Sequence, residues 1–186
     1  MGDYFQSIVD RDVVVGEAER LGARILAVLV QHQIVEQIPS ECVLGRDGGG
    51  YRPGPNFEHA IAPPDEGVRS LRTNGLQVII ERTVFDSGQG GFQLVCDRCR
   101  TKFPYDSADM PWSAAIGTWF SQEGQGLLTC SHCGYTKAIT EWAFDLPWGF
   151  GNLGFKFWNW PPLRESFVEE VTLLLGHRTI VVYGKL

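Results

Sequence analysis

The sequence predicts an α+β fold, with a mixed sheet, a helix near each end of the chain and a cysteine-bearing insertion between them. Two apolar patterns with helical spacing lie near the two ends of the chain, and short β-branched and aromatic runs lie between them. Four of the five cysteines form two C-x-x-C pairs. The chain has 186 residues, of which 44% are hydrophobic and 20% charged, and this excludes a mainly disordered protein.

The first helix is expected between Asp12 and about Glu36, with Asp12 placed to cap its N-terminus. Its apolar residues recur at helical spacing, at Val14, Ala18, Leu21, Ile25, Val28 and Leu29. Pro39 and Ser40 end this segment. The glycines and prolines between residues 45 and 64 predict a long irregular loop after it.

A β-hairpin is expected around Asn74-Gly75, a dipeptide that favours the tight turn of two-residue hairpins. Its arms would run from Val68 to Arg72 and from Leu76 to Phe85. Alternation along the second arm places three apolar residues on one face: Leu76, Val78 and Ile80.

Further extended segments are expected at residues 92–96, 126–130, 135–144 and 154–160. The first two each run into a cysteine pair. In the last, alternation places Phe155 and Phe157 on one face, and on the other Lys156, Trp158 and Trp160. All six tryptophans lie between residues 112 and 160, and we expect Trp158 and Trp160 to share a partly exposed face that could bind a partner.

A second helix is expected from Pro161-Pro162 to Gly176, because proline suits a helix start and glycine a helix end. Its apolar stripe consists of Leu163, Phe167, Val171 and Leu174. A β-branched strand from Arg178 to Tyr183 follows. The end of the chain therefore predicts a strand-helix-strand unit, which is usually right-handed when its strands are parallel.

The cysteine pairs are Cys96 with Cys99 and Cys130 with Cys133, and residues 100–129 separate them. Cysteines with two residues between them suit the corners of one tetrahedral metal site better than a disulfide framework. We therefore expect a reducing cytoplasmic compartment. The fifth cysteine, Cys42, is interpreted as a small buried apolar residue. Gly134 after the second pair suits left-handed backbone, whereas Arg100 stands at the matching place after the first pair.

Residues 96–137 resemble the zinc-ribbon family in these two C-x-x-C turns and in the similar residues that follow each turn. The resemblance implies a structural zinc ion held by all four cysteines on a small antiparallel ribbon. We therefore expect an inserted ribbon at 96–137 within an α+β domain formed by residues 1–95 and 138–186.

The same spacing also resembles the rubredoxins, which are iron electron carriers, and Tyr105-Asp106 follows the first pair as their pattern suggests. The sequence departs from that pattern because no proline follows Cys130 and no glycine follows Cys99. No flavin fingerprint accompanies the cysteines. Iron therefore stays the alternative metal and electron transfer the alternative function.

Four cysteine ligands saturate a zinc ion, whereas a catalytic zinc keeps an open position. His132 lies between two ligands, where a side chain normally points outward. The sequence contains no H-E-x-x-H, G-x-S-x-G or phosphate-loop motif, so no enzyme class is indicated. We expect a non-catalytic protein with an interaction or regulatory role and a protein as its partner.

The formal net charge is −6, and a zinc ion with four thiolates would take it to about −8. Arg98, Arg100 and Lys102 could contact phosphates, but acidic residues balance the basic ones between residues 96 and 137. Nucleic acid is therefore not the expected partner. A nucleic-acid accessory role stays an alternative, in which Arg98 and Arg100 would contact the phosphates. The sequence has no signal-peptide pattern and no apolar run of membrane-spanning length, so no membrane association is expected.

Overall fold

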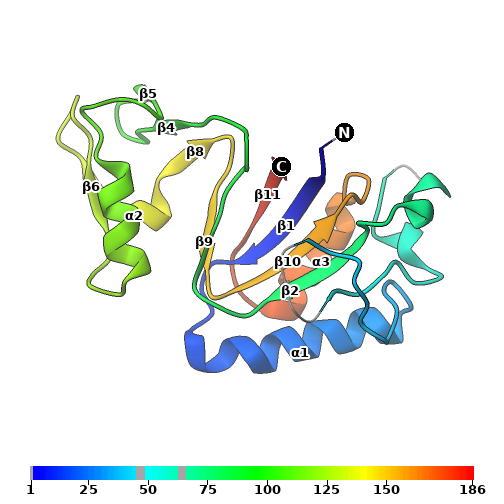
Figure 1. Cartoon of the computed structure of the whole chain (residues 1–186). Coiled ribbons are helices and arrows are strands. Elements are labelled where there is room, and N and C mark those ends of the chain that lie inside the picture. Colours follow the sequence, from blue (N-terminus) through cyan, green and yellow to red (C-terminus); the bar gives the residue numbers. More distant parts are fainter. Residues whose placement is uncertain (1, 45–48, 63–65) are drawn as a thin grey trace.

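The structure is a computed structural model that describes residues 2–44, 49–62 and 66–186. It has two parts: a four-stranded sheet with two long helices, and an insertion that carries the cysteine quartet at one end of the molecule (Figure 1). Helices and strands are both well represented in the first part, and this confirms the α+β class.

The four-stranded sheet has the order β11-β1-β10-β2. Its strands are β1 (Tyr4–Asp10), β2 (Gly75–Ile79), β10 (Leu153–Trp158) and β11 (Thr179–Lys185). All neighbouring pairs are antiparallel. Because β10 and β11 both pair with β1, they run in the same direction on its two sides, and the expected strand-helix-strand unit encloses β1.

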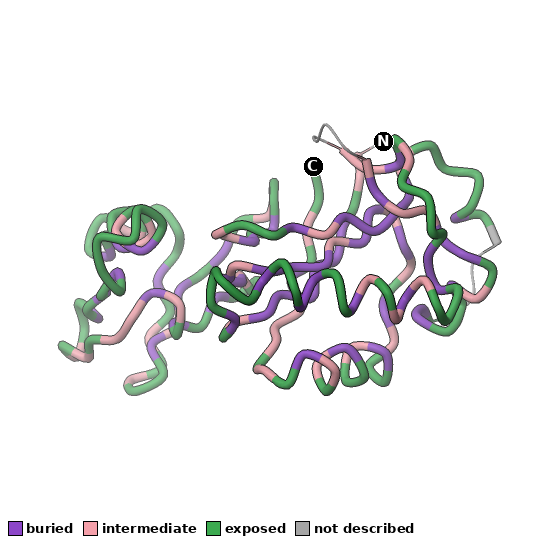
Figure 2. Tube along the Cα trace, turned by 90° about the horizontal axis from the view of Figure 1, so that it is seen from below, coloured by how far each residue is buried: buried purple, intermediate pink, exposed green. Residues whose placement is uncertain are grey.

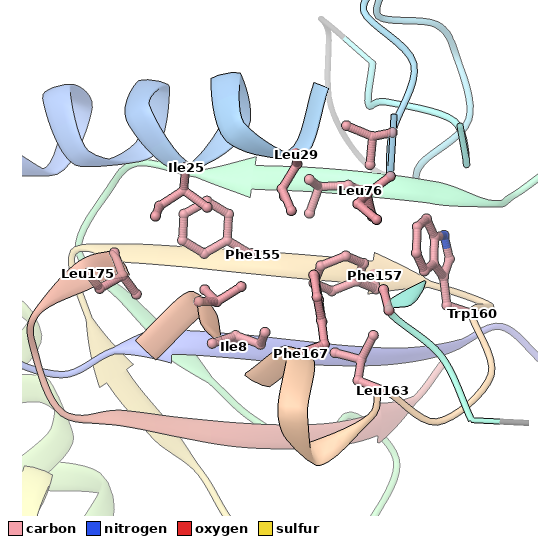
Figure 3. Close-up of a cluster of buried hydrophobic side chains, with 14 of the residues drawn as sticks. Ile8, Ile25, Leu29, Leu76, Phe155, Phe157, Trp160, Leu163, Phe167 and Leu175 are labelled. Atoms are coloured by element: carbon pink, nitrogen blue, oxygen red, sulfur yellow. The ribbon is translucent and has the colours of Figure 1, made fainter. Parts of the chain in front are cut away.

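Two helices, α1 (Val15–Gln31) and α3 (Glu165–Leu175), cover the same face of this sheet. Figure 3 shows their buried side chains meeting Ile8, Phe155 and Phe157 of the central strands. Each large apolar side chain buried in this way contributes about 1.5–3 kcal/mol. Most of the apolar residues expected on the two stripes are buried against the sheet. The exceptions are Val14, which precedes α1 and is 58% exposed, and Val28 and Leu174, which are only partly buried, while Leu175 is the buried residue at the end of α3.

The opposite face of the sheet carries a smaller cluster formed by Val9, Ile79, Phe85 and Val182. Phe85 belongs to β3 (Thr83–Phe85), which pairs with β9 (Gly149–Gly151). A Cβ at Gly154 would lie 2.4 Å from the Phe85 ring, so only glycine fits beneath it. This pair of short strands connects the sheet to the insertion.

The insertion has its own hydrophobic core. Its elements are β4 (Gln93–Val95), β5 (Lys102–Pro104), α2 (Trp112–Phe120), β6 (Leu127–Thr129), β7 (Thr136–Ala138), a 3-10 turn (Ile139–Glu141) and β8 (Ala143–Asp145). The buried cluster extends from Phe92 to Phe150, beyond the expected limits at 96 and 137, and the domain division stays a prediction. In Figure 2 buried positions run through both parts, while exposed positions follow the outer side of the helices.

Charged residues join the insertion to the end of the sheet. Arg11 donates a hydrogen bond to the Thr140 carbonyl at 2.6 Å and pairs with Glu141 at 3.2 Å. Arg178 pairs with Asp12 at 2.7 Å and with Glu141 at 3.3 Å. Polar contacts therefore hold the Ile139–Glu141 turn against both β1 and β11.

A stacked arginine makes a second junction between the parts. The Arg82 guanidinium lies 4.0 Å from the centre of the Trp119 ring, and its Nε donates to the Trp119 carbonyl at 2.9 Å. Burial beside the ring lowers the pKa of Arg82 from its usual value. The end of α2 is thus fixed to the segment between β2 and β3.

The hairpin expected around Asn74-Gly75 is wrong. The first three residues of its first arm lie in a 3-10 helix, Glu66–Ser70, and β2 pairs with β10 instead. Asn74 is fully buried, and its side-chain amide donates to the Val68 carbonyl. Gly75 is required by packing, because a Cβ there would lie 2.4 Å from the Cys42 sulfur. The dipeptide therefore precedes a strand without forming a hairpin turn.

The Asp12 cap is also wrong, because Val14 precedes the first turn of α1 and no side chain caps it. Asp12 binds Arg178 instead. The expected irregular loop contains a 3-10 turn at Phe57–His59, and part of that loop lies outside the described residues. The end of α3 is as expected: Gly176 follows it with φ 74°.

Several elements had no counterpart in the sequence expectations. They include β1, which lies inside the four-stranded sheet, the helix α2, and the short strands β5 and β9. Within the described ranges, no helix is long and apolar enough to cross a membrane.

Candidate metal site

The four paired cysteines converge on one point. Their sulfur atoms all lie within 4.8 Å of one another. Cys96 Sγ lies 3.7 Å from Cys133 Sγ, and Cys99 Sγ lies 3.8 Å from Cys130 Sγ. A tetrahedral site with metal–sulfur bonds of about 2.3 Å has sulfur–sulfur edges of about 3.8 Å. The quartet is therefore arranged to hold one metal ion, as the sequence spacing predicts.

The two cysteine turns repeat the same backbone hydrogen bonds. In the first, Cys96 N–H donates to the Thr101 carbonyl at 3.0 Å and Arg100 N–H to the Cys96 carbonyl at 2.8 Å. In the second, Cys130 N–H donates to the Tyr135 carbonyl at 2.8 Å and Gly134 N–H to the Cys130 carbonyl at 2.9 Å. The two turns are thus equivalent grips on one site.

Each turn connects two short antiparallel strands. Val95 pairs with Lys102 before and after the first turn, and Thr129 pairs with Thr136 around the second. The hairpins β4–β5 and β6–β7 hold the cysteines at their tips, since pairing of the strands fixes where each turn begins and ends. Two short antiparallel hairpins therefore carry the cysteines, and this arrangement is compatible with the inserted ribbon that the resemblance implies.

The site is packed on one side and open on the other. Cys96 and Cys130 are buried, whereas Cys99 and Cys133 are partly exposed. The insertion core, including Leu94, Leu128 and Ile139, belongs to the same cluster as the buried cysteines. A metal ion here would tie both hairpins to that core.

Hydrogen bonding and burial shift the pKa values of Cys99 and Cys133 in opposite directions. The hydrogen bond between Cys99 Sγ and Thr101 Oγ1, 3.2 Å long, favours the thiolate and lowers the pKa of Cys99 to about 6. The Tyr135 backbone amide favours the Cys133 thiolate, but burial and hydrogen bonds with the other three sulfurs outweigh it and raise its pKa to about 12. At neutral pH the Cys99 sulfur is therefore ready to bind a cation, whereas the Cys133 thiol must first lose its proton.

Lys137 links the two turns outside the quartet. Its ammonium pairs with Asp97 of the first turn and donates to the Glu141 carbonyl at 2.6 Å. It also lies 5.4 Å from the centre of the Trp142 ring. The partly buried ammonium of Lys137 therefore ties the first turn to the segment that follows the second turn, and the sequence did not single it out.

The other residues predicted near the site lie outside the quartet. His132 is exposed and does not belong to the metal-binding group found among the described residues. Arg98 and Arg100 are exposed, and neither has an ion pair within the described part of the chain. Lys102 pairs with Asp145 at 3.0 Å. The two arginines are thus available to a partner, whereas Lys102 is already paired with the Asp145 carboxylate.

The expectation for Trp158 and Trp160 is wrong as regards exposure. They are only 3% and 5% exposed. Trp158 donates to Gln77 Oε1 at 3.0 Å and contacts Phe5, whereas Trp160 follows the strand end and packs against Phe57 and Phe157 on the helix-covered side. The pair shares no face, and its partner-binding role remains an untested prediction without an exposed surface to support it.

A buried acid outside the quartet was also missed. Asp10 is fully buried and accepts hydrogen bonds from the backbone N–H groups of Asp12 and Val13, at 3.0 and 2.9 Å. His177 Nδ1 lies 2.9 Å from its second oxygen. These residues are 167 positions apart, so sequence spacing carried no signal for the pair.

The candidate site is therefore the cysteine quartet, and its donor set of four sulfur atoms fits a zinc or iron ion. Comparison of the chain with protein-family models, with curated proteins and with solved structures found no significant match.

Proposed function

We propose that this chain is a non-catalytic zinc-binding protein in which Cys96, Cys99, Cys130 and Cys133 hold one structural zinc ion and the insertion contacts another protein. The observation that carries the metal assignment is the pair of matched turns with sulfur–sulfur distances of 3.7 and 3.8 Å. Four thiolates complete the coordination of zinc, so the ion stabilises the fold and leaves no open position for substrate.

Zinc is proposed over iron because the turns depart from the rubredoxin pattern at two places. Arg100 follows the first pair, and Ser131 follows Cys130. A reducing cytoplasm, which keeps thiols free, is the compartment consistent with this site.

The proposed protein partner is supported by apolar side chains on the surface of the insertion. Tyr105, Phe120, Leu127 and Leu146 are each close to half exposed or more. Such side chains can supply apolar contacts to the surface of another protein. Arg98 and Arg100, exposed beside the quartet, add charged groups that can pair with acidic residues of that partner.

Elemental analysis of the purified chain, produced with zinc and iron both available, tests the metal. We expect a colourless protein with one zinc per chain. Cys130→Ser should lose the zinc and the packing of the insertion core, because three sulfurs leave one corner of the tetrahedron to a weaker ligand. Cys42→Ala is the matched control, since Cys42 is buried away from the quartet, and it should keep the full zinc content. A red protein that contains iron would contradict this proposal and favour an electron-transfer function.

The nucleic-acid alternative has its own test. If Arg98 and Arg100 contact phosphates, the chain should retard DNA or RNA at low salt, and Arg98→Ala with Arg100→Ala should weaken binding and its salt dependence. The proposal of a protein partner expects no retardation. Zinc content must be unchanged in both variants, so that the arginines alone are being tested.

A further inference from the structure

The outer edge of β11 is an uncovered sheet edge. Arg11 N–H donates to the Arg178 carbonyl and Leu186 N–H to the Asp3 carbonyl, which sets the phase of the β1–β11 ladder. In an antiparallel ladder the backbone groups of alternate residues point to opposite sides. The groups of Ile180 and Val182 therefore point toward β1, and those of Thr179, Val181 and Tyr183 point outward. These three residues have no backbone hydrogen-bond partner at that edge among the residues that the structure describes.

Both ends of this edge are closed. Beyond Tyr183, the next outward residue is Lys185, whose N–H donates to the Ser87 carbonyl at 3.2 Å and whose carbonyl accepts from Gln89 N–H at 2.8 Å. At the other end, Arg178 is held by Asp12 and Glu141. The opposite edge of the sheet differs, because Leu76 of β2 exchanges two backbone hydrogen bonds with Tyr51. The open edge of β11 is therefore limited to Thr179–Tyr183.

The sequence of this edge favours pairing. Residues 179–183 read Thr-Ile-Val-Val-Tyr, with no charge and no proline. Such residues have high β-propensity, and proteins usually protect a free edge with charges, proline or a bulge. Tyr183 is 51% exposed beside the free backbone groups. None of the usual protection is found between Thr179 and Tyr183.

The three outward residues are spaced symmetrically about Val181, so this edge can pair with a second copy of itself. We infer that two copies of this chain associate through β11, in antiparallel register about Val181. Val181 would then face Val181 of the second copy, and each Thr179 would face the other copy's Tyr183. Each outward residue supplies one donor and one acceptor, so three pairs form six hydrogen bonds. A shift of the register by two residues leaves one of the three residues in each copy unpaired.

The electrostatics of the edge agree with self-pairing. The window from Thr179 to Tyr183 contains no charged side chain, so no like charges would face each other across it. Arg178, just outside the window, is already neutralised by two carboxylates of its own chain. Between Thr179 and Tyr183 a second copy therefore meets no like charge on its own edge, and the two four-stranded sheets would join into one of eight strands.

Sedimentation velocity and residue-resolved amide hydrogen exchange test this inference, measured across about a hundredfold range of protein concentration. We expect a monomer–dimer equilibrium. At high concentration the amides of Thr179, Val181 and Tyr183 should exchange at least about tenfold more slowly, whereas those of Ile180 and Val182 are already protected by β1. A chain that stays monomeric would overturn the inference. So would a dimer in which the three outward amides exchange at an unchanged rate.

Val181→Pro removes an outward N–H and leaves the inward ladder of β11 intact, so it should weaken dimerisation at least about tenfold. Leu173→Ser is the matched control: Leu173 is 81% exposed on α3, outside the edge, and this change should leave the dimer unaltered. An unchanged dimer in a folded Val181→Pro chain contradicts the inference. If circular dichroism shows that this variant is unfolded, the exchange rates of the unaltered chain decide.

Discussion

Arg100 and Gly134 occupy the same position in the two cysteine turns and adopt the same left-handed backbone, with φ of 61° and 71°. Each donates its N–H to the carbonyl of the first cysteine of its pair. Left-handed backbone costs a residue with a Cβ about 1–2 kcal/mol, whereas glycine adopts it freely. The first turn therefore keeps its shape despite arginine, because its hydrogen bonds and its neighbouring strands hold the backbone there.

Exchanging the residue type at these two positions should have opposite effects on stability. Gly134→Ala should lower the free energy of unfolding by about 1 kcal/mol, because a Cβ there meets no atom within 4 Å and only the backbone conformation is penalised. Arg100→Gly should raise it by up to about 1 kcal/mol. Denaturant unfolding of the metal-loaded protein measures both changes, and equal effects of the same sign would contradict the equivalence of the turns.

Metal affinity should increase with pH. Zinc binds thiolates, and the pKa of Cys133, raised to about 12, means that this thiol carries a proton at neutral pH in the metal-free protein. The pKa of Cys99, near 6, means that this thiol has already lost its proton. Binding must therefore release at least one proton, and the affinity should rise about tenfold or more per pH unit. Competition titrations with a chelator between pH 6.5 and about 8 measure this slope.

Thr101→Val tests what lowers the pKa of Cys99. It removes the hydroxyl that favours the Cys99 thiolate, so the pKa of Cys99 in the metal-free protein should rise. Alkylation of this thiol at pH 7 should become slower, because the thiolate is the reacting form. An unchanged alkylation rate would show that the hydroxyl does not set the pKa.

Removal of Asp10 should cost much more stability than removal of His177. Asp10→Ala leaves two buried backbone N–H groups without their acceptor, and we expect a loss of about 3 kcal/mol. His177→Ala leaves both of those hydrogen bonds in place, and the partly exposed ring should cost about 1 kcal/mol. Thermal unfolding of the two variants measures the difference. Equal losses would mean that the histidine contact, and not the backbone turn, is the main role of Asp10.

The Arg178 pairs should stabilise the junction of the two parts only above acidic pH. The hydrogen bond from Arg178 holds the pKa of Asp12 below its usual value of 3.8. The stability that this pair contributes is therefore complete above about pH 5 and is lost as the pH falls below 3.8 through the folded pKa. Arg178→Ala should lower the free energy of unfolding at pH 7, where Asp12 is ionised.

The loss caused by Arg178→Ala should shrink in high salt and disappear near pH 2, since exposed charges are screened and Asp12 is then protonated. Arg20→Ala is the control, because the ion pair that Arg20 forms among the described residues is with Glu17 of the same helix, at 3.6 Å. A loss that is independent of both salt and pH would indicate that Arg178 acts through packing.

The metal site was predictable because its signal is local. Two residues between cysteines limit the separation of the sulfurs, and repetition of that spacing indicates a second grip on the same ion. The helical stripes were predictable for a similar reason, since a periodicity of 3.6 residues identifies the buried face of α1 and α3 before any partner is known.

Neighbours remote in sequence explain the failures. β1 is buried on both faces, by α1 and α3 on one and by the cluster around Phe85 on the other, so its polar Gln6, Ser7 and Asp10 concealed a central strand. Asn74-Gly75 looked like a hairpin turn. In the structure the Asn74 side-chain amide donates to the Val68 carbonyl, and the Cys42 sulfur occupies the space where a Cβ of residue 75 would lie. Trp158 and Trp160 looked exposed because the rings that cover them come from Phe5 and Phe57.

The sequence by itself determined the α+β class, the faces of α1 and α3, and the four cysteines that can hold a metal, because each depends on spacing within a short segment. Only the tertiary structure decided that β1 lies inside the sheet, that Asp10 meets His177, and that the edge of β11 is open. These features depend on which strands pair. Strand pairing is set by the burial of side chains from distant segments, and no local pattern records it.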